Sequence, residues 1–587
     1  MATTDEKVEP GASPPEPEHP GWMKALRRYG PIGAVVVLLV GAFLVFGGGG
    51  DDDDDDAGTD GAATGTATED ELILSGPMTP QRAELEDVDV DFGPTCDTES
   101  GRIMLVSVYA PPCVEPFEGD NGGATSPGVT EDEVLIVYYQ ADPALDPLTA
   151  ATAEQAGADV DPESAAATLQ DFVGLYNELF ETYGRNVRVE VYTGTGAGDD
   201  LAAAQADAIA ITEMEPFAVI GGPAQAGANF AGELASNGIV CGPGCATALP
   251  EAIVEEFAPY LWTQGPTPEQ GVALASEMVA NLAGPGKAEL AGSPEMQSQD
   301  RVYGLLHYDN ADGDHQPVFE QFVESLEENG IEIATDVEFT LDLARAQETA
   351  RTNIGRLMEA GVTTIIYYGD PLTPNSLTNE ATAQGYFPEW ILGPNVLMDT
   401  TLFARQVDFE NQWQNGFGMA LIGARGERST DGAWRIYEWA FGKEPANNTV
   451  NIFENYVRTV FTGVHLAGPE LTPESFRDSM LRYPVSGGGP TEPQVSRGEQ
   501  GVWPEFDWGG SDDMALIWFD PEATGKDEVG NEGTGMYRYA NGGERYTLGN
   551  LPDSVEDAGL FDIENSVTVY DQVPEEDTTP RYEPPDV

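Results

Sequence analysis

The sequence predicts an α/β protein with two similar Rossmann-like lobes, joined by a hinge, behind an N-terminal transmembrane helix and a flexible tether. Strand-like and helix-like segments alternate in two rounds, and a stretch rich in Gly, Pro and Ser, 284–299, separates the rounds. Such alternation favours mostly parallel sheets covered by helices on both faces. An uncharged run from Pro31 to Phe46 approaches the roughly 20 residues that span a bilayer and predicts the membrane helix.

Charged residues flank this apolar run on both sides. They are Lys24, Arg27 and Arg28 before the run and the six aspartates 51–56 after it. By the positive-inside rule, residues 1–29 form a cytoplasmic tail, residues 30–47 form the anchor, and the remainder is exported. We therefore expect a single-pass protein of the cell membrane whose C-terminal domain is extracytoplasmic.

A cleaved signal peptide is the alternative interpretation of the apolar run. A signal peptide starts with a short basic region, whereas here a polar stretch rich in Pro and Glu comes first. The uncleaved anchor is therefore favoured. Segment 48–76 is rich in Asp, Gly, Ala and Thr, which predicts an acidic, flexible tether.

The composition excludes several classes of partner. The chain of 587 residues has 26 Lys and Arg against 102 Asp and Glu, a formal net charge of −76. Nucleic acid is excluded as a partner because phosphate contacts need Lys and Arg, and anionic lipid surfaces are disfavoured for the same reason. The acidic residues are spread along the chain, which indicates a solvated surface rather than one binding patch.

Four cysteines predict two disulfides in an exported protein: Cys96, Cys113, Cys241 and Cys245. Three pairings exist, and the local one, Cys96 with Cys113 and Cys241 with Cys245, is favoured because short loops close at little entropic cost. A zinc site needs four convergent ligands, and the chain has only four histidines, so no metal site is expected. Segment 77–127, with the first cysteine pair, is expected to be an N-terminal extension.

The individual elements follow from periodicity and length. Short apolar runs such as VLIVYY are typical of buried strands, and amphipathic runs are typical of helices. The first round contains strand 134–139, helix 163–184, strand 187–193, helix 199–213, strand 217–222, helix 226–238, strand 239–241 and helix 268–283. The second contains strand 302–308, helix 316–330, strand 331–339, helix 344–361, strand 362–369, helix 372–385 and strand 390–395. Helices 432–441, 451–467 and 473–482 follow, then short strand-like pieces from Ser486 onward, and an acidic C-terminal tail, 551–587.

An ordered set of segments matches a known family. The segments are GVTEDEVLIVYY (128–139), LDPLTA (145–150), AVIGGPAQAGA (218–228), IVCGPGCATALPE (239–251), WTQGPTPEQGVALASEMV (262–279), the two second-round stretches 301–333 and 363–386, and ILGPNVLMDTTL (391–402). With them, the chain from about Gly128 to Asn550 resembles the type 1 periplasmic binding proteins. Within that family it is most similar to the branched-chain amino-acid-binding-like substrate-binding proteins of ABC transporters.

The resemblance implies a function without chemistry, in which two lobes close on a small solute. It implies that the chain crosses between the lobes, so that lobe 1 is 128–285 with 446–485 and lobe 2 is 298–445 with 486–550. The expected protein captures a small polar solute, amino-acid-like or amide-like, and delivers it to an ABC importer whose permease is its partner. No cofactor is expected. In open α/β sheets, ligands lie outside the carboxyl ends of the strands.

Position by position, the resemblance assigns ligand-binding roles to several loops. The loop with the family's serines is Pro223, Ala224 and Gln225 here and has no hydroxyl. Ala246 and Thr247 match the next binding segment, where Thr247 either donates its hydroxyl to the ligand or caps the following helix. Asn395 stands where the family often has a glutamate that pairs with the ligand's ammonium, and Asp399 is the alternative carboxylate. The missing serine and glutamate leave an amide, a small polar metabolite or a peptide-like solute open beside an amino acid.

Further candidates lie where predicted strands end. Tyr139 and Gln140 end the first strand and are expected to floor the pocket. Asp309, Asn310, Asp312 and Asp314 follow a second-round strand and could bind a cationic ligand, although turn chemistry alone also explains this composition. The stretch lacks the closing glutamate of a calcium loop. Asp370, after the strand 362–369, is a similar case.

Two other classes of protein are alternatives to a transporter subunit. A sensor or receptor module without transport would use the same fold. An extracellular enzyme is less favoured: TGTGAGDD (193–200) does not match GxGxxG, and the sequence has no GxSxG motif and no P-loop. No catalytic residues are therefore expected.

Overall fold

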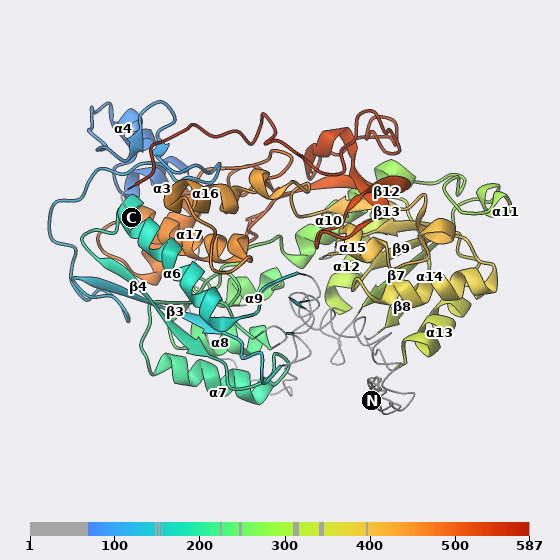
Figure 1. Ribbon diagram of the computed structural model, residues 1–587, viewed down its shortest axis with the longest axis horizontal. Helices are drawn as coiled ribbons and strands as arrows, with labels where there is room; N and C mark the ends of the chain where they lie inside the picture. Colours follow the sequence, from blue (N-terminus) through green and yellow to red (C-terminus); the bar gives the residue numbers. More distant parts are fainter. Residues whose placement is uncertain are drawn as a thin grey trace, which may run out of the picture.

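The computed structural model describes residues 69–146, 150, 153–154, 157–223, 226–245, 249–308, 316–339, 345–394 and 397–585. These residues form two α/β lobes that lie side by side, as Figure 1 shows. The expected cytoplasmic tail, the membrane anchor and most of the tether lie outside the described residues. Within the described part, none of the helices combines the length and apolar character that a membrane crossing requires.

Lobe 1 is built on a parallel four-stranded sheet in the order β4-β3-β5-β6. Its strands are β3 (Glu133–Gln140), β4 (Asn186–Thr193), β5 (Ala218–Ile220) and β6 (Val240–Cys241). Alternate residues of β3 enter different cores: Ile136 packs with helices α6 (Pro162–Leu179) and α17 (Val450–Ala467), and Val137 packs with α7 (Leu201–Thr212) and α8 (Gly227–Ser236). This alternation explains why the strand is a continuous apolar run, because both of its faces are covered.

Lobe 2 contains an eight-stranded mixed sheet in the order β13-β12-β11-β10-β9-β7-β8, with β14 paired to β12. Its parallel strands are β7 (Tyr303–Tyr308), β8 (Ile333–Phe339), β9 (Thr364–Tyr368), β10 (Glu389–Leu392) and β11 (Phe417–Ala420). The antiparallel part is β12 (Asp513–Lys526), β13 (Glu532–Tyr539) and β14 (Arg545–Thr547). Helices α10 (Pro268–Met278) and α12 (Gln316–Glu328) contribute to one core of this lobe, and α13 (Ala346–Glu359) and α14 (Thr373–Gln384) contribute to another. The predicted two-lobe α/β architecture is confirmed.

Between β3 and β14 the chain passes between the lobes three times, and these three passages are called the crossings below. The first crossing leads from β6 and the short helix α9 (Glu251–Glu256) to α10, the second from β11 to α16 (Gly432–Phe441), and the third from α18 (Pro473–Arg482) to β12. The crossings are bonded to one another: Gly510 N donates to Gly265 O at 2.8 Å, and Ala424 N donates to Pro490 O at 2.7 Å.

Two helices lie in a different lobe from the one that the sequence predicted for them. Helix α10 packs against α12 and shares the core of lobe 2, although the expected division assigned it to lobe 1. Helix α16 packs against α17 and shares the core of lobe 1, although it was assigned to lobe 2. An amphipathic pattern shows that one helix face is buried but does not identify the partner, so both boundaries were misplaced.

The N-terminal extension is part of lobe 1. It contains α3 (Glu69–Ser75), α4 (Pro80–Glu86), β1 (Cys96–Asp97) and β2 (Arg102–Ile103). The Cys96–Cys113 disulfide is confirmed, with its Cα atoms 5.6 Å apart. Buried His465 of α17 connects the extension to the lobe, since its ring lies 2.9 Å from Pro112 O and accepts a hydrogen bond from Glu181 N; burial lowers its pKa to about 4. The tether prediction was wrong for its last residues, because α3 is helical and packs against α18.

The predicted acidic tail also packs against the folded chain. Leu551, Ala558 and Leu560 are buried in the core of lobe 2. The residues beyond them leave lobe 2, and Tyr582 packs against the core of lobe 1. The acidic composition of residues 551–587 predicted a tail, because the few apolar residues that anchor it are scattered among charged ones.

Candidate functional site

The carboxyl edges of the two parallel sheets flank the first crossing. At the lobe 1 edge, Trp262 N donates to Cys241 O of β6 at 3.0 Å. At the lobe 2 edge, Gly271 of α10 lies against Pro394, which follows β10; a Cβ on Gly271 would be 3.3 Å from the Pro394 Cβ. The same short segment of the chain therefore contacts the carboxyl edges of both lobes. This is the place where open α/β sheets bind ligands.

The loops after β5 and β6 are packed backbone against backbone. Cys241 and Cys245 form the second disulfide, as predicted, with a Cα separation of 5.5 Å. A Cβ on Gly222 would lie 2.4 Å from Cys245 O, so only glycine allows this approach. Gly244 has φ of +76°, and a Cβ there would be 2.1 Å from the hydroxyl of Tyr456. The disulfide and the two glycines therefore fix the edge of lobe 1 and hold it against α17.

Of the residues predicted to bind the ligand in these two loops, the structure describes only Pro223, which is buried three residues after the end of β5. Ala224, Gln225, Ala246 and Thr247 lie outside the described residues, and their roles stay predictions. Tyr456 was not predicted. It is half-buried over Gly244, and no motif in the sequence marks it.

Tyr139 and Gln140, expected at the pocket floor, are engaged inside lobe 1. The Tyr139 hydroxyl donates to Asp207 of α7 at 3.3 Å, and its ring packs on Phe230 with centroids 5.1 Å apart. Gln140 donates to Pro162 O at 3.0 Å, at the first residue of α6. Asp207 also accepts from Tyr192 and Thr195, at 2.7 to 2.9 Å. These contacts attach the end of β3 to its covering helices.

Asp370 follows β9 and is saturated with hydrogen bonds. Its carboxylate accepts from Leu372 N at 2.8 Å, from Thr373 N at 2.7 Å and from the Thr373 hydroxyl at 2.6 Å. Burial raises the pKa of Asp370, and these donors partly offset the shift. The carboxylate thus orders the turn that leads into α14, which is the turn chemistry considered beside a binding role.

Asp399 follows β10 and has a different environment. It is only 3% exposed, and its Oδ1 has no hydrogen-bond partner among the described residues. Burial raises its pKa to about 7, although the backbone N–H groups of Asp399 and Leu397 partly offset the shift. A buried carboxyl oxygen without a donor is costly in a folded protein. Asp399 is therefore the described candidate best suited to accept a donor group from a ligand.

The other candidates in lobe 2 lie outside the described residues. They are Asp309, Asn310, Asp312, Asp314 and Asn395. Their binding roles stay predictions.

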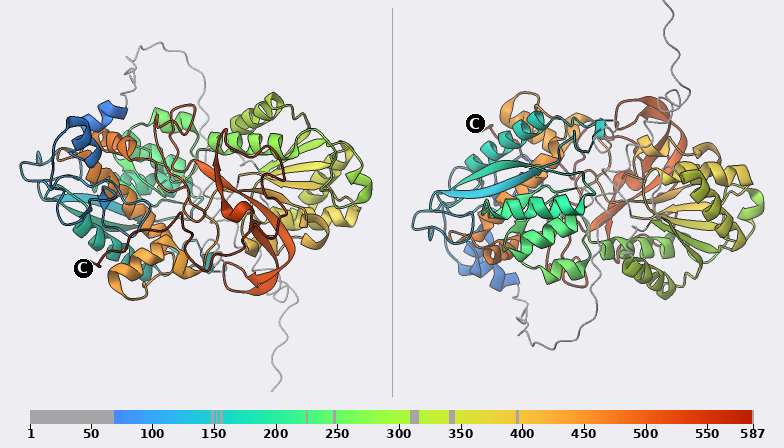
Figure 2. Two further views of the ribbon diagram at one scale, coloured as in Figure 1. Left: turned by 90° about the horizontal axis from the view of Figure 1, so that it is seen from above. Right: turned by 90° about the horizontal axis from the view of Figure 1, so that it is seen from below.

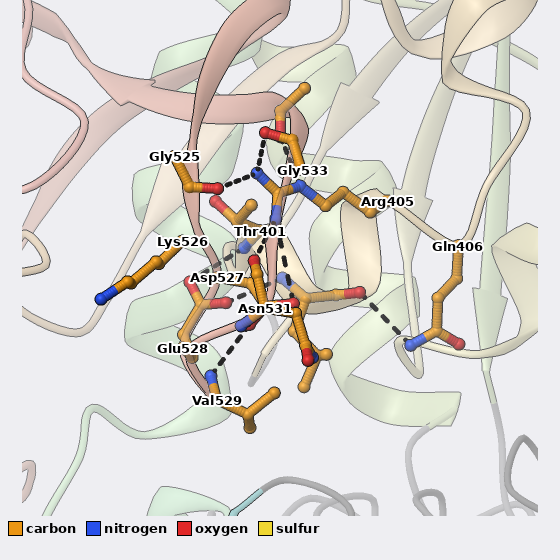
Figure 3. A network of polar contacts seen from close by, with 12 residues as sticks. Thr401, Arg405, Gln406, Gly525, Lys526, Asp527, Glu528, Val529, Asn531 and Gly533 are labelled. Carbon is orange, nitrogen blue, oxygen red and sulfur yellow. Dashed lines mark hydrogen bonds and ion pairs between the residues drawn. The ribbon is translucent and has the colours of Figure 1, made fainter.

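Next to Asp399, the tip of the β12–β13 hairpin is held by a network that the sequence did not predict (Figure 3). The Arg405 guanidinium donates to four backbone carbonyls at 2.8 to 3.0 Å: Gly525, Asn531, Gly533 and Gly535. Glu528 accepts from Thr401 N at 3.0 Å and from Leu402 N at 2.7 Å, at the start of helix α15 (Thr401–Ala404). Arg425 donates to Lys526 O at 2.6 Å and lies 3.7 Å from the Glu528 carboxylate. Both guanidinium groups are thus occupied by the protein itself.

The hairpin tip also reaches lobe 1. A Cβ on Gly157, in the segment before α6, would lie 3.0 Å from Val529 Cγ1. Gly157 is held in turn by Asn448, whose amide donates to Gly157 O at 2.7 Å. The lobes therefore touch at a point far in sequence from the three crossings. The sequence predicted only short strand-like pieces in this region, because Gly525, Gly533 and Gly535 interrupt the strand pattern.

Comparison with known proteins gives structural neighbours only. No family model and no curated protein matches the chain. The fold is similar to a solute-binding protein of an ABC transporter from Rhodopseudomonas palustris in complex with p-hydroxybenzoic acid, at 12% identity and a TM-score of 0.47, over 72% of this chain and 98% of that one. It is also similar to a Leu-, Ile-, Val-, Thr- and Ala-binding protein from Brucella ovis (12% identity, TM-score 0.46, 72% of this chain and 98% of that one).

A third similar structure is a branched-chain amino acid transporter substrate-binding protein from Streptococcus pneumoniae in complex with isoleucine. It shares 14% identity at a TM-score of 0.44, over 70% of this chain and all of that one. These neighbours are of the kind that the sequence segments resembled.

Proposed function

We propose that this protein is a membrane-anchored, extracytoplasmic solute-binding protein, which captures a small polar solute between its lobes and delivers it to an ABC importer. The observation that carries the proposal is the convergence of the two parallel carboxyl edges on one short crossing. A solute bound at one edge would contact the other edge when the lobes rotate about the crossings. The proposal contains no chemical step.

The described charges favour a ligand that donates hydrogen bonds. Asp399 supplies a carboxyl oxygen that has no partner among the described residues, next to the edge of lobe 2. Arg405 and Arg425, the two guanidinium groups of the adjoining network, are bonded to main-chain carbonyls of the β12–β13 hairpin and are not free to bind a ligand carboxylate. An ammonium or amide group suits this arrangement, whereas a simple anion does not. This chemistry agrees with the amino-acid-like or amide-like solute expected from the resemblance.

A binding screen tests the proposal directly. The chain from residue 69 onward, which contains every described element, is heated with amino acids, amides, ureas, polyamines, short peptides and sugars. We expect one chemical class to raise the melting temperature, because a ligand that binds only the folded state stabilises it. A hit should weaken in Asp399→Asn and persist in the matched variant Asp370→Asn. If no class shifts the melting temperature, the solute-binding proposal is wrong and a receptor for a protein partner takes its place.

Anchoring and delivery need a separate experiment, since the anchor lies outside the described residues. Full-length protein should stay with the membrane after washing with high salt and alkali, and deletion of 30–47 should release it. Chemical crosslinking in the native membrane should join it to a permease. Recovery of the untruncated chain in the wash would contradict the anchor.

A further inference from the structure

The C-terminal segment Val567–Tyr582, named the strap below, contacts both lobes and the second and third crossings. In lobe 2 it pairs with the end of β13: Tyr539 N donates to Val567 O at 2.8 Å, and Val567 N donates to Tyr539 O at 3.1 Å. Beside the second crossing, Tyr570 N donates to Arg425 O at 2.8 Å, and Glu427 N donates to Tyr570 O at 2.7 Å. The strap is thus bonded both to lobe 2 and to a segment on which the lobes turn.

Asp577 attaches the strap to the third crossing. Its carboxylate accepts from Thr491 N at 2.8 Å and from the Thr491 hydroxyl at 2.7 Å, and the residue is only 1% exposed. A Cβ on Gly489 would lie 1.9 Å from Asp577 Oδ1, so the crossing carries glycine where the strap approaches it. The contact therefore depends on the carboxylate in the strap and on the absence of a side chain at the facing glycine of the crossing.

The far end of the strap is anchored on lobe 1. Trp439 of α16 donates its indole N–H to Tyr582 O at 2.9 Å, and Arg435 of the same helix donates to the Thr579 hydroxyl at 3.0 Å. The Tyr582 hydroxyl donates to Asp97 at 3.1 Å, next to the disulfide-bonded Cys96. Figures 1 and 2 show the dark red chain leaving lobe 2 and ending at lobe 1, where the C-terminus lies.

The anchors of the strap follow one another closely along the chain, at Val567, Tyr570, Asp577, Thr579 and Tyr582. The strap contains no helix, and Pro574 and Pro580 restrict its backbone on either side of Asp577. A segment bonded at both ends and in the middle cannot lengthen much, because an extended chain spans at most about 3.3–3.6 Å per residue. A change in the angle between the lobes must therefore strain the strap or break one of its contacts.

We propose that the strap restricts rotation of the lobes about the three crossings and keeps the empty protein within a narrow range of lobe angles. The inference concerns the mechanics of this chain and does not depend on which solute binds, or whether one does. Restricting the free state in this way lowers the conformational cost of any binding event between the lobes.

The test measures the distance between the lobes in full-length, ligand-free protein. Spin labels are attached at Ala206→Cys on α7 and Thr352→Cys on α13, which are exposed positions on the two lobes. The native cysteines are protected because all four are in disulfides. Chain termination after Glu576 removes the Asp577 contact to the third crossing and the lobe 1 anchors, but it keeps the Val567 pairing and the Tyr570 contact to the second crossing. Termination after Tyr582 is the matched control.

We expect a single narrow distance distribution for the full chain and for the Tyr582 control. Termination after Glu576 should broaden it at least twofold, while the circular dichroism spectrum stays unchanged. Should that variant fail to fold, Tyr582→Ala combined with Arg435→Ala removes the side-chain anchors on lobe 1, leaves the Trp439 bond to the main chain of residue 582, and should broaden the distribution to a smaller extent. An unchanged distribution in a folded variant that lacks these anchors overturns the proposal.

Discussion

The loops after β9 and β10 each bury an aspartate at the carboxyl edge of the same sheet, but the two carboxylates differ in their hydrogen-bond partners. Asp370 accepts three hydrogen bonds from the turn that follows it. Asp399, in the loop after the neighbouring strand, is buried to the same degree and has an oxygen without a partner among the described residues. Burial raises the pKa of both carboxyls, and that of Asp399 reaches about 7. Position in a loop at the carboxyl edge is therefore not enough to distinguish a structural carboxylate from one available to a ligand, because the surrounding donors differ.

The largest effect is expected at Asp370. The substitution Asp370→Ala leaves two buried N–H groups and a hydroxyl without their acceptor, and each orphaned group costs about 1 kcal/mol or more. We expect the free energy of unfolding in urea to fall by about 3 kcal/mol. Asp370→Asn keeps one acceptor oxygen and should lose less. A loss below about 0.5 kcal/mol for Asp370→Ala would show that these hydrogen bonds do not order the turn.

Substitution of Asp399 by Asn should raise the free energy of unfolding, unlike substitution of Asp370, and the gain should depend on pH. The folded pKa of Asp399, about 7, lies above the unfolded value near 3.8, so the folded state holds the extra proton between these values. The stabilisation from that proton is complete below the unfolded pKa and is lost as the pH rises through 7. Relative to the native chain, Asp399→Asn should therefore gain about 1–2 kcal/mol between pH 5 and pH 8. Parallel unfolding curves for the two proteins across this range would contradict the assignment.

Asp512, in the third crossing, sharpens the comparison because it is another buried aspartate whose Oδ1 has no hydrogen-bond partner in the part of the chain that the structure describes. Burial raises its pKa, and the negative charge of Asp507 raises it further, while Arg497 faces the pair. Asp507 is well bonded, accepting from Gln270 at 2.6 Å and from Gly509 N at 2.8 Å. The native protein should lose stability as the pH rises above 7, and Asp512→Asn should reduce this loss by about 1 kcal/mol. This change is smaller than the one expected for Asp399→Asn, because the carboxylate of Asp507 stays in place. Thermal unfolding at pH 6 and pH 9 measures the difference, and an equal loss in both proteins would refute it.

Much of the fold was predictable because parallel strands covered on both faces must be continuous apolar runs. The strands β3, β4, β7 and β9 and helices such as α16, α17 and α18 lie where the pattern placed them, and α18 has the predicted bounds. The lobe to which α10 and α16 belong was not predictable, because periodicity identifies a buried face and not its partner. The long β12–β13 hairpin was predicted only as short pieces, because Pro521, Gly525 and Gly533 interrupt its pattern.

The candidate site was predictable in location but not in the state of its residues. The sequence placed Tyr139 and Asp370 at strand ends and Asp399 in the loop after a strand, where the structure has them. It could not show that the Tyr139 hydroxyl is bonded to Asp207 or that Asp370 is saturated, because those partners are set by tertiary packing. The same holds for Tyr456 and the Arg405 network, whose roles depend on segments distant in sequence.

The central claim is that a solute is captured by the two lobes together. The most direct measurement is the distance between spin labels at Ala206→Cys and Thr352→Cys, recorded with and without the solute class that stabilises the protein. We predict that saturating solute shifts the distribution to a shorter distance in the native chain and that the shift is lost in Asp399→Asn. A solute that raises the melting temperature while the distance stays unchanged would bind to one lobe alone and would contradict this account.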